Sequence, residues 1–238
     1  MTLRSLVLLV FTLAFGAAPF LTPPFTGYDP QIFPVVIDRP SIQPAGYAFA
    51  IWSVIYLWLF AHAGYGFWKR AHSLDWDATR VPLILSLGLG TLWLWIAAWA
   101  PVLATLAIIA MLATALAAFL LSDEFYDRWL LSAPLAIYAG WLSAAAAVST
   151  GVVAAGYGIL TDTEAAFAML AFVLALSMAV QLLRPEMPVY GLTVIWALIG
   201  VIVANATANP LVALVAAGAA AAMAALLAWQ WKRQRRSR

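Results

Sequence analysis

Residues 210–238 read PLVALVAAGAAAAMAALLAWQWKRQRRSR, an uncharged apolar run followed by a strongly basic end. A helix needs about 20 residues to cross the roughly 30 Å of hydrocarbon in a bilayer, and residues 210–231 supply that length. The basic residues that begin at Lys232 fit an anchor among lipid headgroups. This pattern predicts that the chain ends in a membrane-spanning helix and a basic cytoplasmic tail.

Seven further apolar stretches of similar length precede this one, and each can span a membrane. They are residues 3–21, 45–68, 81–99, 101–121, 129–153, 163–183 and 189–207. The chain of 238 residues is 66% hydrophobic and only 9% charged, which excludes a soluble domain. We therefore predict an all-α, polytopic transmembrane helix bundle of about eight spans.

The basic residues predict how this bundle is oriented. All of the 12 Lys and Arg residues except Arg39 fall on one side of the membrane if the spans alternate in direction. Basic residues concentrate in cytoplasmic loops, so we expect both termini and the loop 69–80 in the cytoplasm. The net charge of +2 then reflects orientation and not affinity for nucleic acid. The expected location is a bacterial inner membrane.

The first stretch also has some features of a signal peptide. Arg4 precedes its apolar run, and residues 15–18 resemble a small-residue cleavage site. The apolar run continues to Leu21, which favours a retained transmembrane helix.

The connection between the first two stretches, residues 22–44, is the longest loop and is expected on the outer face. It is apolar and is stiffened by Pro23, Pro24, Pro30, Pro34, Pro40 and Pro44. A long and stiff apolar loop usually packs over something. We interpret it as a lid on the outer end of the bundle.

Residues 39–56 follow as RPSIQPAGYAFAIWSVIY. This segment resembles the signature of the tryptophan-rich sensory protein family (TspO/MBR), bacterial relatives of the mitochondrial translocator protein, which reads approximately K-P-S-W-x-P-P-x-W-V-F-G-P-V-W-T-x-L-Y. Tyr47 stands in place of a family tryptophan and Ser53 in place of a threonine. The matching residues are Pro40, Ser41, Pro44, Phe49, Trp52 and Tyr56.

The resemblance implies a five-helix membrane region over residues 1–153. Residues 154–238 then form three additional helices and the tail, outside the core family plan. Gly90 and Ala146 depart from the family's Leu-Asn pattern, and Ala45 replaces the second residue of its Pro-Pro pair.

The aromatic residues of this region predict a ligand site. Phe49, Trp52 and Tyr56 share a helix face by their i, i+3, i+7 spacing, and Trp95 and Trp99 do so by i, i+4. Such rings beneath a lid could hold a flat apolar ring system. The candidate ligand-binding residues are Pro44, Tyr47, Phe49, Trp52, Tyr56, Trp95, Trp99, Tyr138 and Trp141. The alternative is aromatic packing with interface anchoring, as expected for Trp68, Trp129, Trp229 and Trp231.

Signals for catalysis or ion transport are weak. The predicted helix cores carry no Asp, Glu, Lys or Arg, so the groups that move protons in pumps are missing. The chain has no cysteine, which excludes thiolate metal sites. His62 is the single histidine within a predicted span. It is interpreted as a hydrogen-bonded or interfacial imidazole, with a weak alternative as an axial ligand to a tetrapyrrole metal.

Three functional hypotheses follow. By resemblance, the protein is a non-enzymatic membrane receptor or sensor for an apolar ring ligand, either sterol-like or a tetrapyrrole such as a porphyrin, haem or a bacteriochlorophyll-like pigment, with no cofactor required. The second hypothesis is an accessory or assembly subunit of a photosynthetic or respiratory complex, and the third is a porphyrin carrier or enzyme. The expected partners are membrane lipids, the ring ligand, and a homo-oligomer or larger membrane complex, but no nucleic acid.

Overall fold

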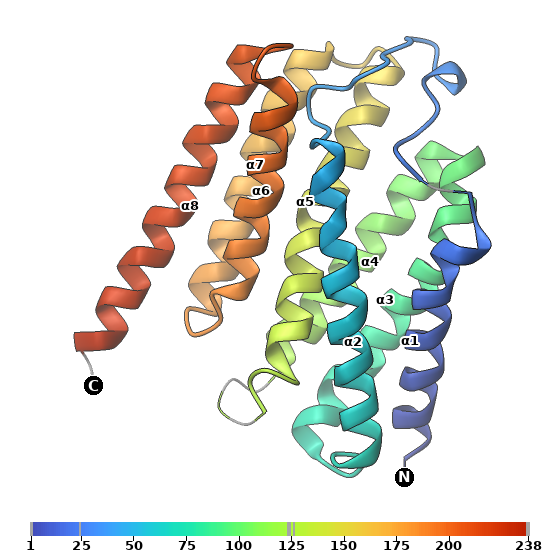
Figure 1. Cartoon of the computed structure of the whole chain (residues 1–238), viewed down its shortest axis with the longest axis vertical. Helices are drawn as coiled ribbons and strands as arrows, with labels where there is room; N and C mark the ends of the chain where they lie inside the picture. Colours follow the sequence, from blue (N-terminus) through green and yellow to red (C-terminus); the bar gives the residue numbers. More distant parts are fainter. Residues whose placement is uncertain (1, 24, 123–124, 126, 237–238) are drawn as a thin grey trace. The chain divides into compact units, whose positions relative to one another are not determined.

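The computed structural model describes residues 2–23, 25–122, 125 and 127–236, and Pro24 of the predicted lid lies outside this range. Eight α-helices and two short 3-10 turns make up the regular structure of these residues (Figure 1). The helices are α1 (Leu3–Leu21), α2 (Ile51–Trp68), α3 (Leu74–Trp99), α4 (Pro101–Leu121), α5 (Ser132–Gly156), α6 (Asp162–Leu183), α7 (Val189–Asn205) and α8 (Pro210–Arg236), and the turns are η1 (Pro30–Ile32) and η2 (Gly46–Ala50).

The predicted all-α, polytopic bundle is confirmed. Seven helices are long and apolar enough to cross a membrane, and α7 is a shorter apolar helix of 17 residues. A helix satisfies its own backbone hydrogen bonds, which is the condition for crossing lipid. The protein is therefore an integral membrane protein.

The chain divides into two compact units, and the division does not follow the order of the sequence. The first unit contains Met1–Asp29 and Ala50–Leu142, and the second contains Pro30–Phe49 and Ser143–Arg238. The chain passes from one unit to the other inside α5. The sequence suggested a different division, at residue 153, between a family-like five-helix region and three additional helices. That division stays a prediction.

In the first unit, α1 packs against α2 and α3, and α3 packs against α4. The junction between α3 and α4 is tight, because Ala100 alone separates them and Pro101 takes the first turn of α4. A proline is well suited to that position, where its missing N–H leaves no intrahelical bond unmade. Near this end, Trp93 of α3 donates its indole N–H to the carbonyl of Ala104 at 2.9 Å.

The start of α3 corrects the sequence prediction. The helix begins at Leu74 and not at Val81, so Pro82 lies inside the helix and not in its first turn. Asp75 and Asp77 in the first turn favour this earlier start, because carboxylates stabilise helix N-termini.

The same correction applies to Arg80, which was expected in a loop. Its side chain is only 1% exposed, and its guanidinium donates to the carbonyls of Ala71 and Arg70 at 2.9 and 2.8 Å and to Asp77 at 3.0 Å. A buried cation is tolerated in a helix when its donors are satisfied in this way.

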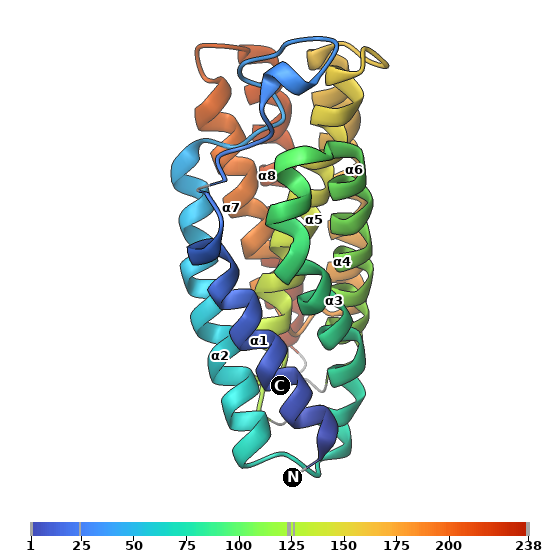
Figure 2. The ribbon, with the colours of Figure 1, turned by 90° about the vertical axis from the view of Figure 1, so that its right-hand side faces the viewer.

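In the second unit, α6, α7 and α8 run side by side (Figure 2). A buried polar network joins the last turn of α6, the first turn of α7 and the final part of α8. Gln181 of α6 accepts from the backbone N–H of Gly191 at 3.1 Å and donates to the side chain of Gln230 at 3.2 Å. In return, Gln230 donates to the carbonyl of Gln181 at 2.9 Å. Amides hydrogen-bonded between helices hold spans together where lipid supplies no hydrophobic drive for association.

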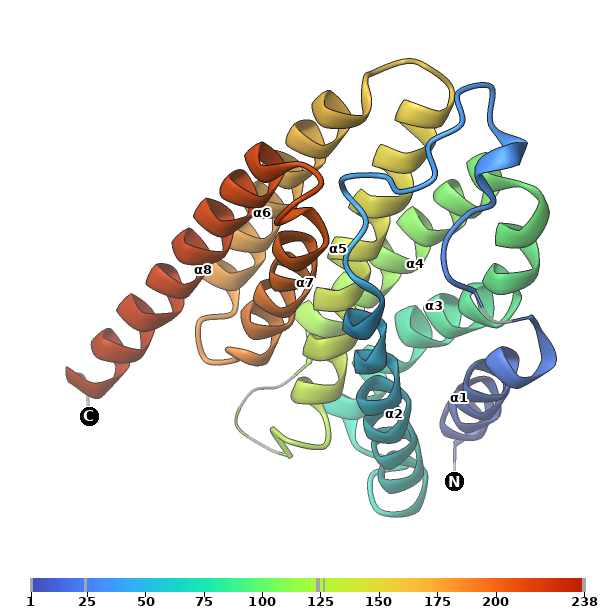
Figure 3. The same ribbon diagram turned by 45° about the horizontal axis from the view of Figure 1, so that its top comes forward.

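The segment 30–49 lies against the helices of this second unit (Figure 3). Ala45 donates its N–H to the carbonyl of Gly200 in α7 at 2.9 Å, and Trp196 donates its indole N–H to the carbonyl of Ala48 at 2.9 Å. Pro44 and Ala48 approach Gly200 so closely that a Cβ there would lie 2.8 Å from the Cβ of Pro44 and 2.9 Å from that of Ala48. The absence of a side chain at Gly200 is what lets the segment reach α7.

This close approach predicts a specific stability loss. Gly200→Ala should lower the free energy of unfolding by about 1–3 kcal/mol, because the added methyl overpacks the contact with Pro44 and Ala48. The measurement is the thermal unfolding midpoint of purified protein in detergent.

Gly218 of α8 provides the matched control, since nothing lies within 4 Å of a Cβ built there. Gly218→Ala should leave the midpoint unchanged or raise it slightly, because alanine is the better helix former. Equal midpoints for the two variants would contradict the proposed role of Gly200.

Candidate functional site

Five aromatic rings meet in the first unit. Trp52 and Tyr56 of α2 stack on each other, with ring centroids 5.4 Å apart and planes at 21°. Phe15 of α1 makes edge contacts with Trp52, Tyr56 and Tyr138 at 5.9, 5.2 and 5.8 Å. Trp141 of α5 meets Trp52 edge-on at 6.2 Å. These five residues are called the ring cluster below, and they include four of the predicted site residues.

The helices place the ring cluster through one polar contact and one glycine. The hydroxyls of Tyr138 and Ser86 share a hydrogen bond of 3.0 Å, and Ser86 donates to the carbonyl of Met111 at 2.8 Å. At Gly90 of α3, a Cβ would lie 2.5 Å from the ring of Phe15 and 2.9 Å from the terminal methyl of Met111. Gly90, where the sequence departs from the family pattern, therefore makes the room that Phe15 occupies.

Sequence reasoning missed Phe15 because the resemblance offers no motif in the first helix. It also assigned two tryptophans of α3, Trp95 and Trp99, to the ligand site, and the structure does not bring them into the ring cluster. Trp95 is 53% exposed and Trp99 is 84% exposed. Their i, i+4 spacing does align them, but the face of α3 that packs inward carries Ser86 and Gly90.

Three other predicted site residues belong to the second unit. Tyr47 makes an edge contact with Trp196 of α7 at 5.6 Å, and Pro44 packs against Gly200. Phe49 is the last residue of that unit before the chain enters α2. A role for these three in ligand binding stays a prediction.

The predicted lid is packed at both of its described ends. Phe25 meets Trp93 of α3 edge-on at 5.0 Å within the first unit. Within the second unit, Val35 donates its N–H to the carbonyl of Gly156 at 2.9 Å. The ring of Phe33 packs so closely on Gly156 that a Cβ built there would lie only 2.5 Å from it. Gly156 therefore accommodates Phe33 as Gly90 accommodates Phe15.

Ser41 of the family signature anchors the segment to the ends of three helices. Asp162, the first residue of α6, accepts the backbone N–H of Ser41 at 2.9 Å and also its hydroxyl. Asn205 donates to the carbonyl of Ser41 at 2.7 Å. Asn209 donates to the hydroxyl of Ser41 at 3.2 Å and to Thr163 at 2.9 Å. Signature residues thus hold the backbone in place, whatever else they do.

His62 is fully buried in α2 of the first unit. Its Nδ1 lies 2.8 Å from the carbonyl oxygen of Leu130, and its ring stacks on Trp76 with centroids 4.8 Å apart. A carbonyl only accepts, so Nδ1 carries the hydrogen and Nε2 keeps a lone pair. Among the described residues, no partner lies within hydrogen-bonding distance of Nε2. The hydrogen-bonded imidazole is present, and an axial role for Nε2 stays a hypothesis.

A metal site of several side chains has no candidate in the part of the chain that the structure describes. No group of three or more His, Cys, Asp or Glu residues there could hold an ion.

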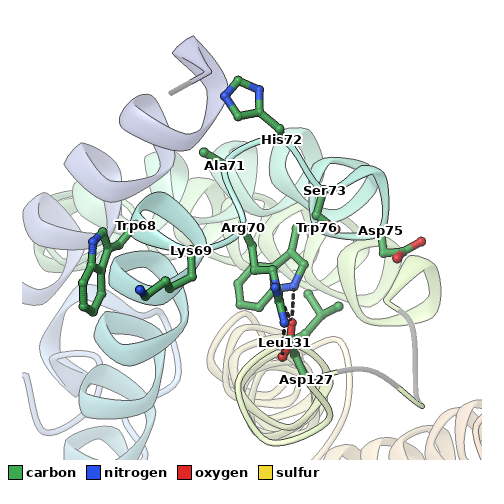
Figure 4. Close-up of a pocket in the computed structure, with 10 residues that line it drawn as sticks. All are labelled: Trp68, Lys69, Arg70, Ala71, His72, Ser73, Asp75, Trp76, Asp127 and Leu131. Atoms are coloured by element: carbon green, nitrogen blue, oxygen red, sulfur yellow. Dashed lines mark hydrogen bonds and ion pairs between the residues drawn. The ribbon is translucent and has the colours of Figure 1, made fainter.

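A second feature of the first unit is a pocket of about 480 Å³ at the connection between α2 and α3 (Figure 4). It is called the inner pocket below, and its lining consists of Trp68, Lys69, Arg70, Ala71, His72, Ser73, Asp75, Trp76, Asp127 and Leu131.

At the centre of the inner pocket, Arg70 forms a two-pronged ion pair with Asp127, with Nε 2.5 Å and Nη2 3.1 Å from the carboxylate oxygens. The buried indole of Trp76 donates to the same carboxylate at 3.0 Å. The hydrogen bond from Arg70 is the main cause that lowers the pKa of Asp127 below its ordinary value. Asp127 also holds a left-handed backbone, with φ of 54°, which Asp and Asn adopt more readily than most residues.

A comparison with known protein families identifies the family of this chain. The family model described as TSPO-like protein matches residues 35–229. The chain belongs to the TSPO-like family. No curated protein and no solved structure matches it.

The TSPO-like match runs from the segment before α2 through α6 and α7 and into the last turns of α8. It therefore includes the helices that the sequence comparison had set outside the core family plan. The family assignment predicted from the signature is confirmed, and with it a membrane protein of the sensor or receptor type.

The ion pair in the inner pocket predicts a pH dependence. Because the pKa of Asp127 is lowered on folding, the pair contributes its full stabilisation above the ordinary carboxyl pKa and loses it as the pH falls through the lower folded-state value. Asp127→Asn keeps the backbone conformation but removes the charge, so it should lower the thermal midpoint by a few degrees at pH 7.

The test compares thermal unfolding of the wild type and Asp127→Asn from neutral pH down to about pH 3. The gap between them should stay constant above the ordinary carboxyl pKa and close below it. Asp38→Asn is the control, because this exposed carboxylate lies outside the helices and forms no ion pair among the described residues. A gap for Asp127→Asn that persists unchanged into acid would show that the ion pair is not its source.

Proposed function

We propose that this protein is a non-enzymatic membrane receptor that binds an apolar ring ligand, tetrapyrrole or sterol-like, in the ring cluster. The observation that supports this proposal is the convergence of five rings from α1, α2 and α5, with one stacked pair bordered by edge-on neighbours. Aromatic faces and edges of this kind are the surfaces that recognise flat apolar molecules.

The stacked pair suggests how such a ligand is accommodated. Trp52 and Tyr56 are only partly buried, whereas Phe15, Tyr138 and Trp141 are at most 4% exposed. A flat ligand inserted between two rings needs about 7 Å, since carbon atoms in contact lie roughly 3.5 Å apart. The pair is closer than that, so a ligand enters by rotating Trp52 or Tyr56 away from its neighbour. Each aromatic contact given up costs about 0.5–1.5 kcal/mol, which a larger ring can offset.

Phe15 makes this arrangement suited to a sensor. It contacts Trp52, Tyr56 and Tyr138 at once, so a ligand that separates these rings displaces a residue of α1. Gly90 lies directly behind Phe15 and leaves it no free space in that direction. Ligand binding therefore changes the packing of α1 against α3, which is the kind of discrete rearrangement that can carry a signal.

The start of the loop after α1 is proposed as the lid of this site. Phe25 packs on Trp93 of α3 and on Tyr28, and all three belong to the first unit. A lid of this kind slows release of a bound ligand more than it alters entry.

The role of the ring cluster is tested by tryptophan substitution. Trp52→Ala and Trp141→Ala should each weaken binding of protoporphyrin IX by about 1–2 kcal/mol, which is roughly a fivefold to thirtyfold rise in Kd. Binding is followed through the absorbance and fluorescence of the porphyrin itself, because the substitutions alter the protein's own fluorescence.

Trp95→Ala and Trp99→Ala are the matched controls, since both residues are exposed on α3. They should leave Kd unchanged, and Phe25→Ala should mainly raise the dissociation rate. Competition by a sterol separates the two ligand classes. An unchanged Kd for both ring-cluster variants, with a normal thermal midpoint, would remove the ring cluster as the site.

One observation favours the second hypothesis, an accessory subunit. The exposed face of α8 carries small residues, among them Gly218, Ala221 and Ala225, and nothing lies within 4 Å of a Cβ built on Gly218. Small residues let another helix approach closely. A homo-oligomer or a larger complex would use such a face.

The two hypotheses differ in what a native gel shows after gentle extraction. A subunit should migrate with a larger complex, and Gly218→Leu combined with Ala222→Leu should release it because the bulky side chains block close approach. A receptor acting alone should migrate identically with and without these substitutions. Wild-type migration of the double variant within a large complex would exclude α8 as the docking face.

A further inference from the structure

Two glutamines determine which way the last turns of α8 face. Gln230 is 4% exposed and donates its amide to the carbonyl of Gln181 in α6 at 2.9 Å. One turn later, Gln234 donates to the carbonyl of Pro185, in the connection between α6 and α7, at 2.9 Å. Positions 230 and 234 share a helix face by their i, i+4 spacing, so this face of α8 is turned toward α6. The opposite face is turned away from it.

That opposite face carries three cations, Lys232, Arg235 and Arg236. With about 3.6 residues per turn, their positions lie within about 60° of the direction opposite to positions 230 and 234. Lys232 is three and four positions from the two arginines, and Cβ atoms at these spacings are about 5–6 Å apart, so one phosphate can interact with more than one of the side chains. All three are exposed, and none forms an ion pair among the described residues. They are called the basic face below.

The sequence around the basic face does not neutralise it. Residues 210–238 contain no Asp and no Glu. The connection between α6 and α7 contributes Arg184 and Glu186, which together add no net charge. The basic face therefore gives this end of the second unit an excess of positive charge, which favours an anionic partner.

The length of α8 places the basic face at the level of lipid headgroups. Its apolar part, residues 210–231, is about 33 Å long and matches the roughly 30 Å of hydrocarbon in a bilayer. The helix continues to Arg236 (Figure 1), and residues 232–236 add about 7.5 Å, roughly the depth of one headgroup layer. Trp229 and Trp231 are 50% and 53% exposed, as is typical of tryptophans at the membrane interface. Lipid phosphates are therefore expected beside the basic face.

One of the three cations is held in position by a tryptophan. The guanidinium of Arg235 lies over the ring of Trp231, 3.7 Å from its centroid. A guanidinium above a ring keeps N–H donors at its edge, where two of them can bond to one phosphate. The contact also restricts the side chain before a ligand binds, which reduces the entropy that binding costs.

We propose that the basic face binds a phospholipid whose headgroup has a net negative charge, with a phosphate that no ammonium balances, as in phosphatidylglycerol. Arg235 donates to the phosphate, and Lys232 and Arg236 supply further positive charge beside it. A zwitterionic headgroup binds more weakly, because its ammonium meets the same cations. The site contains no residue of the ring cluster, so it does not depend on the proposed receptor function.

The test uses the purified full-length protein, delipidated in detergent and titrated with lipids that have the same acyl chains. Retention of each lipid is measured by native mass spectrometry, together with the thermal midpoint. A basic residue near an anionic lipid contributes about fivefold in affinity. With three such residues, phosphatidylglycerol should bind at least about tenfold more tightly than phosphatidylcholine.

Substitutions separate the basic face from other cations at span ends. Arg235→Gln should weaken phosphatidylglycerol about fivefold with little effect on phosphatidylcholine. The triple variant Lys232→Gln, Arg235→Gln, Arg236→Gln should abolish the preference. Arg235→Lys keeps the charge but not the paired donors, so its affinity should fall between those of the wild type and Arg235→Gln.

Lys69→Gln is the matched control. The ammonium of Lys69 also lies over a tryptophan ring at the end of a span, 3.9 Å from the centroid of Trp68, but it is not part of the basic face. This substitution should leave the preference for phosphatidylglycerol unchanged.

Three results would overturn the proposal. The first is equal retention of the two lipids by the wild type, or a preference that survives the triple substitution in a protein with a normal thermal midpoint. The second is an equal loss in Lys69→Gln and Arg235→Gln, which would assign the preference to net charge alone. The third is glycerophosphoglycerol, the same headgroup without acyl chains, binding as tightly as the lipid, which would make a soluble phosphate ester the occupant.

Discussion

The constraint on which this structure depends is the need of polar groups in lipid to find partners within the protein. Water is absent from the bilayer core, so an unpaired hydroxyl or amide there costs far more than at a soluble surface. Many hydroxyls in the spans bond to a carbonyl of their own helix, as Thr12 does to Leu8, and three pairs of side chains bond across helices. The pairs are Ser86 with Tyr138, Ser143 with Tyr190, and Gln181 with Gln230. Each pair fixes the rotation of two helices that apolar packing alone would leave less defined.

Glycines then decide how closely the remaining surfaces approach. Gly90, Gly156 and Gly200 each face a bulky group that a methyl would strike, namely Phe15, Phe33 and Pro44. Two of these contacts attach the proline-rich segment to the second unit, and the third seats a ring of the candidate site. In an apolar bundle, glycines determine how elements pack against one another as much as the large side chains do.

Much of the fold was predictable because its signals are long and repeated. Eight apolar stretches, the proline at the start of α4 and the basic end of α8 are local patterns, and the structure has all of them. The start of α3 was not predictable by the same reasoning. Hydropathy alone assigns the charged residues Asp75, Asp77 and Arg80 to a loop. In the structure, Asp75 and Asp77 lie in the first turn of the helix, and Arg80 pairs with Asp77 and donates to the carbonyl of Ala71.

The candidate site shows the same limit. Helical spacing predicted that Trp52 and Tyr56 share a face, and the structure stacks them. Spacing also aligned Trp95 with Trp99, but it cannot tell which face of α3 turns inward. That choice depends on the small residues Ser86 and Gly90, because Gly90 faces Phe15 of α1 and Ser86 bonds to Tyr138 and to the carbonyl of Met111. Phe15 was not predicted, because a single aromatic residue in an apolar helix forms no spacing pattern with others in the sequence.

The contacts within the ring cluster are weaker than the contacts that hold the helices around it, and this difference bears on the proposed sensing. Its rings are held by weak edge contacts, while the frame around them is held by hydrogen bonds such as that between Tyr138 and Ser86. Aromatic contacts are worth about 0.5–1.5 kcal/mol each, and losing a buried hydrogen bond costs about 1–3 kcal/mol. Under the proposed function, a ligand would therefore rearrange Trp52 and Tyr56 without loosening α3 or α5. The remaining element that can yield is α1, where Phe15 lies between the rings and Gly90. In the proposed receptor, the packing of the first helix is therefore where ligand binding would become a conformational change.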